Sequence, residues 1–535
     1  LRQYQLEGIA WLRFLHTLRL NGALCDSMGL GKTLQALICV AISHDVVHHA
    51  APDSKPVSIV VCPSTLVRHW IAEINRFFKS DDPVFFPLEL SGSSTSRRAV
   101  WEKGLVFCNI IVTSYSVLRS DIRMLASQSY HYCVLDEGHL LKNPKTETAK
   151  ASRQLRSKHR LLLSGTPVQN HVHELWAVFD FLMPNFLGSS VFFSEKYART
   201  ISKGQAPGAS VREISEGIEK LKTLHQQVLP FILRREKQQV LRELPSKLVT
   251  QIEVPMSDLQ RRLYTDFCSF ADVQQSLRAL DRAAKDDLGD RCLEQAGRSS
   301  LQALLFLRLL STHPWLVRSA IPVASEISDN DWLRFDTSGK IRALADLLRE
   351  LSIFTDDLSA ADNDSSLLYC EDDHTKCLIF AQFIQSLDVV EKLLFKPHIP
   401  SLKYLRLDGR VPARRRYAIA EEFNRNDEIK VLLLTTRVGG LGLNLTGADT
   451  VIFLEHDFNP FADLQAMDRV HRIGQKKAVC VYRLVLVDSI DQRIMKLQEK
   501  KLAMSEAIVN ADNSTMFSMG TDRLLDIFTM RSDQE

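Results

Sequence analysis

At 535 residues the chain is too long for one hydrophobic core, and about 100–200 residues per domain predicts three or four folding units. Hydrophobic residues at 45% and charged residues at 24% are typical of a soluble globular protein. The net charge of +3 excludes a strongly basic chain, so any nucleic-acid surface must be local. No apolar run reaches the ~18 residues of a membrane helix, and no signal peptide is evident.

The cysteines predict buried, reduced thiols in an intracellular protein rather than zinc ligands or disulfides. None forms a C-x-x-C pair, and most lie in apolar runs. Their positions are 25, 39, 62, 108, 133, 268, 292, 370, 377 and 480. The chain opens in a structured segment without an initiator Met, and we expect it to be a piece of a longer protein.

Short apolar runs alternate with helical patterns over the first 180 residues, which predicts βαβ units and a parallel sheet. The expected strands are 57–62, 109–113, 131–135 and 160–163. The pattern then becomes mostly helical over 172–302, with one further strand at 248–254 and a loop at 202–210.

The alternation returns after a helix at 340–351, with strands expected at 377–380, 404–407, 431–434 and 450–454. Between them, residues 355–376 hold seven acidic residues against one Lys. We expect a solvated tether there, with an autoinhibitory mimic of DNA as the alternative. The predicted domains are an α/β lobe at 1–180, helical protrusions at 181–335, a second α/β lobe at 336–500 and a tail at 501–535.

The segment 24–33 resembles a phosphate-binding loop, because a glycine-rich turn follows an apolar run and opens a helix. In such a loop Lys32 reaches the β- and γ-phosphates of ATP and Thr33 binds Mg²⁺. Gly29 and Gly31 bring the backbone close to the nucleotide. The strict pattern has Gly where this chain has Asp26, so a glycine turn with a helix cap is the alternative.

An acidic pair, Asp136 and Glu137, follows the apolar run 131–135. Ligands of open α/β sheets bind beyond the carboxyl ends of strands, so both carboxylates should face the phosphate site. Asp136 would hold Mg²⁺, and Glu137 would orient and deprotonate the attacking water. The alternative is a solvated acidic pair after a strand.

Two arginines near the end of the chain, Arg469 and Arg472, are spaced to share one face of a helix. Two guanidinium groups on one face suit a polyphosphate and the charge that develops on a transferring γ-phosphoryl group. The alternative is a surface helix with solvated arginines. Upstream, glycines 439, 440 and 442 have no side chains, so a ligand or phosphate could come close to the backbone there. The alternative is a mobile loop without such a role.

These motifs resemble, in order and spacing, those of the Swi2/Snf2 family of superfamily 2 helicase-like ATPases. The matching segments are RQYQLEGIAWL (2–12), DSMGLGKTLQ (26–35), CPSTLVRHW (62–70), TSY (113–115), DEGHLLKN (136–143), LSGTPVQN (163–170), LRREKQQVLRELPSK (233–247), LRLLSTHPWL (307–316), SGKIRAL (338–344), LIFAQF (378–383), LDGR (407–410), TTRVGGLGLNL (435–445) and QAMDRVHRIGQ (465–475).

The resemblance implies an α/β fold of two RecA-like lobes with helical protrusions, and an ATPase that moves along double-stranded DNA without separating its strands. Gln5 corresponds to the adenine-reading glutamine. Ser164, Gly165 and Thr166 correspond to the element that couples hydrolysis to lobe movement. Arg469 and Arg472 correspond to the arginine fingers. The family's DNA contacts correspond to Ser64, Thr65, Thr113, Ser114, Gln382, Thr435, Arg437, Gly440 and Asn444.

Phe458 stands where many members have Trp, and it is expected either to contact a DNA groove or to pack in the core. Four segments resemble the TATA-binding-protein-associated, modifier-of-transcription subfamily: the DEGH motif, CDSM before GLGKT, FDFLMPNFLG (179–188) and the tail 518–528. That resemblance implies a nuclear enzyme that strips TATA-box-binding protein from promoter DNA, gripping it through an N-terminal region absent here. A nucleosome-remodelling or DNA-repair translocase, and an inactive DNA-bound scaffold, are the alternatives.

Overall fold

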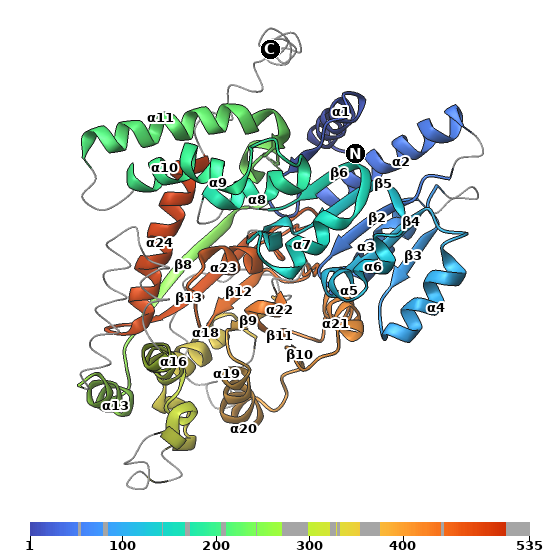
Figure 1. Ribbon diagram of the computed structural model, residues 1–535. Coiled ribbons are helices and arrows are strands. Elements are labelled where there is room, and N and C mark those ends of the chain that lie inside the picture. Colours follow the sequence, from blue (N-terminus) through green and yellow to red (C-terminus); the bar gives the residue numbers. More distant parts are fainter. Residues whose placement is uncertain are drawn as a thin grey trace. The chain divides into compact units, whose positions relative to one another are not determined.

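The computed structural model describes residues 1–51, 55–78, 84–141, 143–165, 172–204, 210–241, 243–269, 298–320, 328, 332–353, 375–439 and 443–509. The chain divides into one compact unit over Leu1–Arg242 together with the segment from Leu502, and a second over Glu243–Lys501 (Figure 1). Segments expected as helical protrusions therefore belong to both units. Among the described helices, none has the length and apolar character needed to cross a membrane.

The first unit is built on a parallel sheet in the order β3-β4-β2-β5-β6-β1-β7. Its strands are β1 (Gly22–Leu24), β2 (Ser58–Cys62), β3 (Pro87–Leu90), β4 (Ile110–Ser114), β5 (Ser129–Asp136), β6 (Arg156–Leu163) and β7 (Ile232–Leu233). Its helices are α1 (Gln3–Thr17), α2 (Lys32–Ala50), α3 (Val67–Phe77), α4 (Ser94–Gly104), α5 (Tyr115–Ser120), α6 (Ile122–Leu125), α7 (Glu147–Gln154), α8 (Val172–Leu182), α9 (Ser190–Phe193), α10 (Arg199–Gly204), α11 (Val211–Val228) and α12 (Lys237–Val240).

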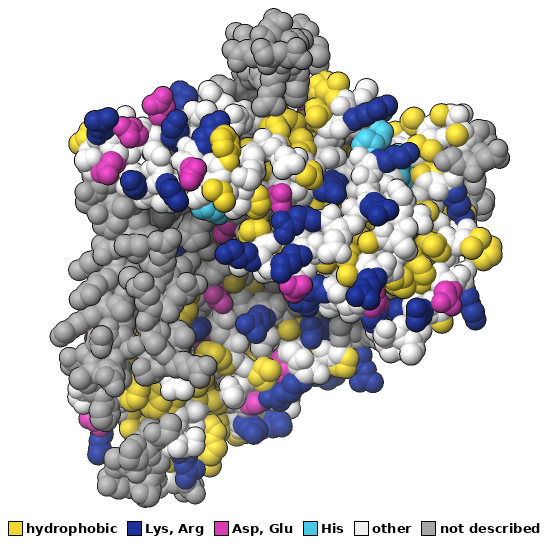
Figure 2. Space-filling view, in the orientation of Figure 1, with side chains coloured by type: hydrophobic (Ala, Val, Ile, Leu, Met, Phe, Trp, Pro, Cys, Tyr) yellow, Lys and Arg dark blue, Asp and Glu magenta, His cyan; other side chains and the backbone are white. Residues whose placement is uncertain are grey.

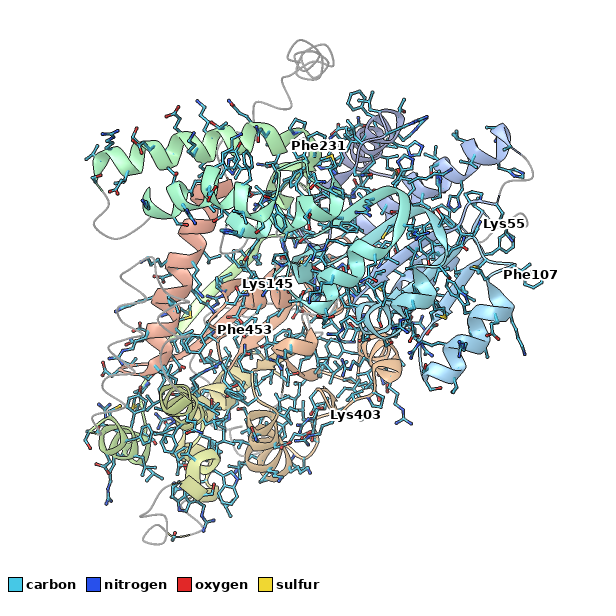
Figure 3. The ribbon with its side chains drawn as sticks, in the orientation of Figure 1. Lys55, Phe107, Lys145, Phe231, Lys403 and Phe453 are labelled. Atoms are coloured by element: carbon cyan, nitrogen blue, oxygen red, sulfur yellow. The ribbon has the colours of Figure 1, made fainter. Side chains whose placement is uncertain are left out.

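The central strands of this sheet are apolar because both of their faces are covered. One face packs against α2 and α3, through residues such as Leu37 and Trp70. The other face packs against α5, α7 and α8, and Phe231 belongs to the same core (Figure 3). Every strand predicted in this part of the chain is present, which confirms the parallel α/β class.

The second unit has its own parallel sheet, in the order β10-β11-β9-β12-β13-β8. Its strands are β8 (Lys247–Val254), β9 (Cys377–Ala381), β10 (Tyr404–Leu407), β11 (Val431–Thr435), β12 (Thr450–Phe453) and β13 (Val479–Leu486). Its main helices are α13 (Asp258–Cys268), α16 (Arg298–Thr312), α18 (Gly339–Glu350), α19 (Ile384–Val389), α21 (Ala413–Arg425), α22 (Thr436–Gly439), α23 (Pro460–Met467) and α24 (Ile490–Val509). Phe453 stacks on Phe380 at 5.1 Å between ring centroids, inside the core of this unit (Figure 3).

Two expectations change in detail. The loop predicted at 202–210 is wrong at its start, because α10 continues to Gly204. Most of the acidic segment predicted at 355–376, up to position 374, lies outside the described residues. Its last residue, Lys376, is not part of a solvated tether, because it is buried and donates to the carbonyl oxygen of Phe423 at 2.9 Å. The eight cysteines that the structure describes are free thiols, as predicted, and Cys292 and Cys370 fall outside the described residues.

Candidate nucleotide site

The glycine-rich loop joins β1 to α2 and has a left-handed backbone at two of its glycines. Gly29 and Gly31 have φ of 84° and 78°, in the left-handed region where a side chain is disfavoured. A Cβ atom at Gly31 would also come within 2.5 Å of Gln5 Nε2. Because α2 begins at Lys32, the unbonded N–H groups of its first turn are available at the loop.

Helix α1 supports this loop from outside. The Tyr4 hydroxyl donates to the Leu30 carbonyl at 3.0 Å, and Gln5 Nε2 donates to the same carbonyl at 3.2 Å. Gln5 is buried and its Oε1 accepts from the backbone N–H of Arg2 at 3.0 Å. The structure thus places Gln5 beside the glycine loop.

The Lys32 ammonium lies inside the loop and donates to the carbonyl oxygens of Asp26 and Ser27 at 2.7 and 3.3 Å. Burial lowers the pKa of Lys32, and the charges of Glu137, Asp26 and Asp136 oppose that shift. The strand-end carboxylates are therefore near enough to act on the loop lysine, as expected for one site.

Asp136 ends β5 and is held in a fixed orientation. Trp70 Nε1 donates to its Oδ2 at 2.9 Å, and the Glu137 N–H donates to its Oδ1 at 2.9 Å. Burial, followed by the charge of Glu137, raises the pKa of Asp136 to about 6. Glu137 itself has a φ of 53°, a strained conformation of the kind found at functional sites.

The donors of this site fit a magnesium ion. Asp136 offers carboxylate oxygens next to a second negative charge, and Thr33 is a half-buried residue in the first turn of α2. Hard oxygen ligands of this kind suit Mg²⁺, which would neutralise the crowded carboxylates.

Sequence reasoning missed Arg235, which follows β7 and is 1% exposed. Its Nε and its backbone N–H donate to Asp26 Oδ1 at 3.0 and 3.1 Å, and its Nη2 donates to Gln35 Oε1 at 3.0 Å. The predictions from sequence also placed Asp26 among the nucleotide-binding residues, and the structure corrects this, because the Asp26 side chain is fully buried and bound to Arg235. The two residues are 209 positions apart, so no local pattern could reveal the pair.

The predicted coupling element follows β6 and lies beside the glycine loop. The Ser164 N–H donates to the Leu24 carbonyl at 3.1 Å, and a Cβ atom at Gly165 would lie 2.8 Å from Met28 Cγ. Thr166 lies outside the described residues. A change at the loop could therefore reach this element through direct contacts.

The predicted DNA contacts of the first unit differ in exposure. Ser64 is exposed, whereas Thr65 is buried. The Thr113 hydroxyl is buried and donates to the Leu90 carbonyl at 3.1 Å. Ser114 caps α5 by accepting from the Val117 N–H at 3.3 Å. Thr113 and Ser114 thus hold the end of β4 in place, and neither hydroxyl lies on the surface.

In the second unit the prediction that Arg469 and Arg472 share a helical face is wrong. Helix α23 ends at Met467, and the chain continues through turns to Gly474, whose φ is 104°. The Arg469 carbonyl accepts from the Leu445 N–H at 3.2 Å, which ties this turn to the segment after α22. Arg469 is buried and Arg472 is half-buried.

The other predicted DNA contacts of the second unit surround the ends of β9 and β11. Glu455 holds the backbone just after β9, because its Oε2 accepts from the N–H groups of Gln382 and Phe383 at 2.6 and 3.1 Å. Arg437 and Asn444 are exposed, Thr435 is buried, and Gly440 lies outside the described residues.

Phe458 is half-buried and packs against the core, with the Arg308 guanidinium 5.0 Å from its ring. The same guanidinium lies 5.0 Å from the ring of Phe383. Phe458 was expected either to contact a DNA groove or to pack in the core, and these contacts agree with packing.

A parallel α/β unit with a glycine loop between strand and helix, and an acidic pair at the end of a nearby strand, defines a nucleoside-triphosphate site of the P-loop class. The SNF2-related domain family matches residues 4–316, and the helicase conserved C-terminal domain family matches residues 362–474. The chain belongs to the SNF2-related family of helicase-like ATPases.

Individual relatives extend this result. The chain is 42% identical over 99% of its length to TATA-binding protein-associated factor BTAF1 of Arabidopsis thaliana, and 41% identical over all of its length to TATA-binding protein-associated factor 172 of Homo sapiens. It spans only 26% and 29% of the length of these two relatives.

Identity is 30% to the ISWI chromatin-remodeling complex ATPase ISW1 of Saccharomyces cerevisiae, over 96% of this chain and 41% of that protein. The solved SWI2/SNF2 ATPase core of Sulfolobus solfataricus in complex with double-stranded DNA is 27% identical, with a TM-score of 0.41, covering 98% of this chain and 96% of that one.

Proposed function

We propose that this chain is a nuclear, DNA-stimulated ATP motor that moves along double-stranded DNA and removes TATA-box-binding protein from promoters. The observation that supports this role best is identity of 41–42% to TATA-binding protein-associated factors, against 30% to an ISWI remodeller and 31% to a CSB repair protein. Remodelling of nucleosomes and DNA repair are accordingly the second choices within the family.

The proposed chemistry is assigned to residues of the first unit. Lys32 contacts the β- and γ-phosphates of ATP, and Thr33 and Asp136 would hold Mg²⁺, which neutralises phosphate charge when bound. Glu137 orients the attacking water and accepts its proton. The loop with Gly29 and Gly31 supplies backbone N–H groups to the phosphates.

Further roles remain part of the same proposal. Gln5 reads the adenine, and the segment that includes Ser164 couples hydrolysis to movement of the lobes. Arg469 and Arg472 of the second unit stabilise the charge on the γ-phosphoryl group in the transition state. DNA is held through its phosphates, so binding is independent of sequence. On the face drawn in Figure 2, Lys and Arg side chains are spread over the described residues, among acidic ones.

An inactive DNA-bound scaffold is disfavoured because the whole catalytic set is present. A scaffold has no need for Lys32, Asp136, Glu137, Arg469 and Arg472 together, or for a strained backbone at Glu137.

Two substitutions test the ATP site. Lys32→Ala should abolish ATP binding, because the phosphates lose their cation. Glu137→Gln should bind ATP with unchanged affinity and lose turnover by about 10²-fold or more, since the water has no base. Lys145→Ala, at an exposed lysine of the same unit (Figure 3), is the control and should behave like the wild type. Turnover by Glu137→Gln at the wild-type rate would refute the assignment of the base.

The arginine assignment needs its own test. Arg472→Ala should retain ATP affinity and lose turnover by about 10³-fold or more, because a finger acts only on the transition state. Nucleotide affinity by fluorescence titration and steady-state hydrolysis separate the two effects. A loss of tenfold or less would count against a finger.

A further inference from the structure

Three histidines from separate segments meet in the first unit, away from the ATP site. His16 lies in the last turn of α1, His131 near the start of β5 and His159 within β6. Each ring offers one nitrogen, and these three nitrogens lie within 4.8 Å of one another. Histidine is the commonest metal ligand in proteins, and three convergent imidazoles match the protein part of many zinc sites.

The cluster is separate from the catalytic machinery. His131 precedes Asp136 by five residues on the same strand, so at about 3.3 Å per residue the two lie about 17 Å apart. Strands β5 and β6, which carry His131 and His159, are direct neighbours in the sheet, and Tyr132 is paired with His159. The cluster thus lies nearer the amino ends of the strands, whereas the phosphate site lies at their carboxyl ends.

One ring nitrogen of the cluster has no hydrogen-bond partner among the described residues. His16 Nδ1 is 3.0 Å from the Tyr132 hydroxyl, and His131 Nε2 is 3.1 Å from the Ser43 hydroxyl. His159 is 8% exposed, and its buried Nδ1 has no hydrogen-bond partner among the described residues. A buried nitrogen in that state is destabilising, and coordination of an ion would satisfy it.

The charge state of the rings suits a metal. Burial lowers the pKa of His131 to about 4 and that of His159 to about 3, and it also lowers the pKa of His16. At neutral pH the rings are therefore uncharged and have lone pairs to donate. Among the described residues no carboxylate belongs to the cluster, so the donor set suits a transition metal and not Mg²⁺ or Ca²⁺.

We propose that His16, His131 and His159 form a binding site for a divalent transition-metal ion, with zinc as the ion, that ties the end of α1 to strands β5 and β6. In a tetrahedral site with Zn–N bonds of about 2.0–2.1 Å, ligand nitrogens stand about 3.4 Å apart, so the rings need to close by about 1.4 Å at most. Water or the Tyr132 hydroxyl takes the fourth position. The ion would be structural, because it anchors the helix that carries Tyr4 and Gln5.

The competing interpretation is a stacked aromatic cluster without an ion. The ring centroids of His16 and His159 are 4.1 Å apart, and those of Tyr132 and His159 are 5.0 Å apart. Both interpretations predict neutral rings at pH 7, so protonation does not separate them. Binding of a metal does.

The test uses the full 535-residue chain, stripped with a chelator and titrated with Co²⁺, which reports tetrahedral nitrogen ligation by its visible absorption. We expect one equivalent to bind, Zn²⁺ to displace it, and the melting temperature to rise with metal concentration. His159→Asn should weaken binding by at least about tenfold, whereas His49→Asn, at an exposed histidine on α2, should leave it unchanged.

His16→Asn gives a second variant at a half-buried position, in case His159→Asn does not fold. Circular dichroism of each metal-free variant checks its folding. Absence of stoichiometric binding by the wild type would overturn the proposal in favour of the stacked cluster. Wild-type affinity in a folded His159→Asn or His16→Asn variant would overturn it as well, because the ion would then be bound elsewhere.

Discussion

The buried ion pair of Asp26 and Arg235 holds the glycine loop to the strand β7. Both side chains are at most 1% exposed, and removing one partner of such a pair leaves a buried charge that costs about 3–5 kcal/mol. Asp26→Asn or Arg235→Met should therefore lower the free energy of unfolding by about that amount, measured with urea. The double variant should be more stable than either single one, because no charge is left alone.

A surface pair provides the control for this prediction. Arg199 and Glu195 are 3.9 Å apart with exposed side chains, so Arg199→Met should change stability by less than about 1 kcal/mol. Equal effects of Arg199→Met and Arg235→Met would show that the loop pair has no special part in stability.

The acidity of Asp136 leads to a prediction about pH. Its pKa of about 6 is set by burial and by Glu137, and the hydrogen bond from Trp70 lowers it. Asp136 must be ionised to bind Mg²⁺, so kcat/KM for MgATP should fall as pH decreases through about 6. Trp70→Phe removes a bond that favours the charged form, so this acid limb should move to higher pH.

The matched control is Trp176→Phe, which removes the Trp176 Nε1 hydrogen bond to the Gly188 carbonyl, 3.0 Å long, away from the site. It should leave the pH profile in place. An unchanged acid limb in Trp70→Phe, or an equal shift in both variants, would mean that this bond does not tune Asp136.

The residues that sequence could predict are those whose chemistry is encoded by close neighbours. Lys32 follows two glycines, and Asp136 ends an apolar strand, so each could be recognised from about ten residues of sequence. Arg235, Trp70 and Tyr4 support the same site from distant segments. Their roles depend on tertiary contacts, which no local pattern specifies.

At the scale of elements, helix α1 packs closely against α2 and the loop between β1 and α2. A Cβ atom at Gly8 would lie 2.1 Å from Gln35 Oε1 and 2.7 Å from Arg235 Nη2. An alanine inside a helix normally adds roughly 0.5–1 kcal/mol of stability over glycine. Gly8→Ala should instead destabilise the first unit and weaken ATP binding, because α1 carries Gln5.

Thermal unfolding and nucleotide titration measure these two effects. Gly409→Ala is the control, because in the part of the chain that the structure describes the nearest atom to a Cβ there is Ile384 Cδ1, at 3.8 Å. A Gly8→Ala variant as stable as the wild type would show that α1 can shift without disturbing the loop.

The elements themselves were predictable where burial is strong. Strands β2, β4, β9 and β11 are buried along their whole length, and each appears in the sequence as an apolar run. Strands β3 and β7 are short and largely half-buried, so they lack that signal. The helix expected through Arg472 failed because it rested on arginine spacing alone, while the chain leaves the helix at Met467.

At the scale of the whole chain, a net charge of +3 predicts modest binding to DNA that depends on local phosphate contacts. ATP hydrolysis should therefore rise with any duplex, to within about twofold whether or not it contains a TATA box, because phosphates do not report sequence. The affinity should fall between 50 and 200 mM salt by about tenfold for every two phosphates that the protein neutralises. A requirement for a TATA box would contradict backbone tracking.

The last prediction concerns the protein substrate and rests on the proposed motor. The TATA-binding protein-associated relatives have about three quarters of their length outside the region that matches this chain, since it spans 26–29% of them. If those outer regions bind TATA-box-binding protein, they tether the motor beside its target. Such a tether raises the overall binding strength by about 10²–10⁴-fold. These 535 residues should therefore hydrolyse ATP on a complex of DNA and TATA-box-binding protein, yet need at least about 10²-fold more enzyme than full-length human factor 172 to dissociate it. A gel-shift time course with both proteins, and with Lys32→Ala to show that dissociation requires ATP, gives the answer. Equal efficiency of the two proteins would place recognition of the substrate within this chain.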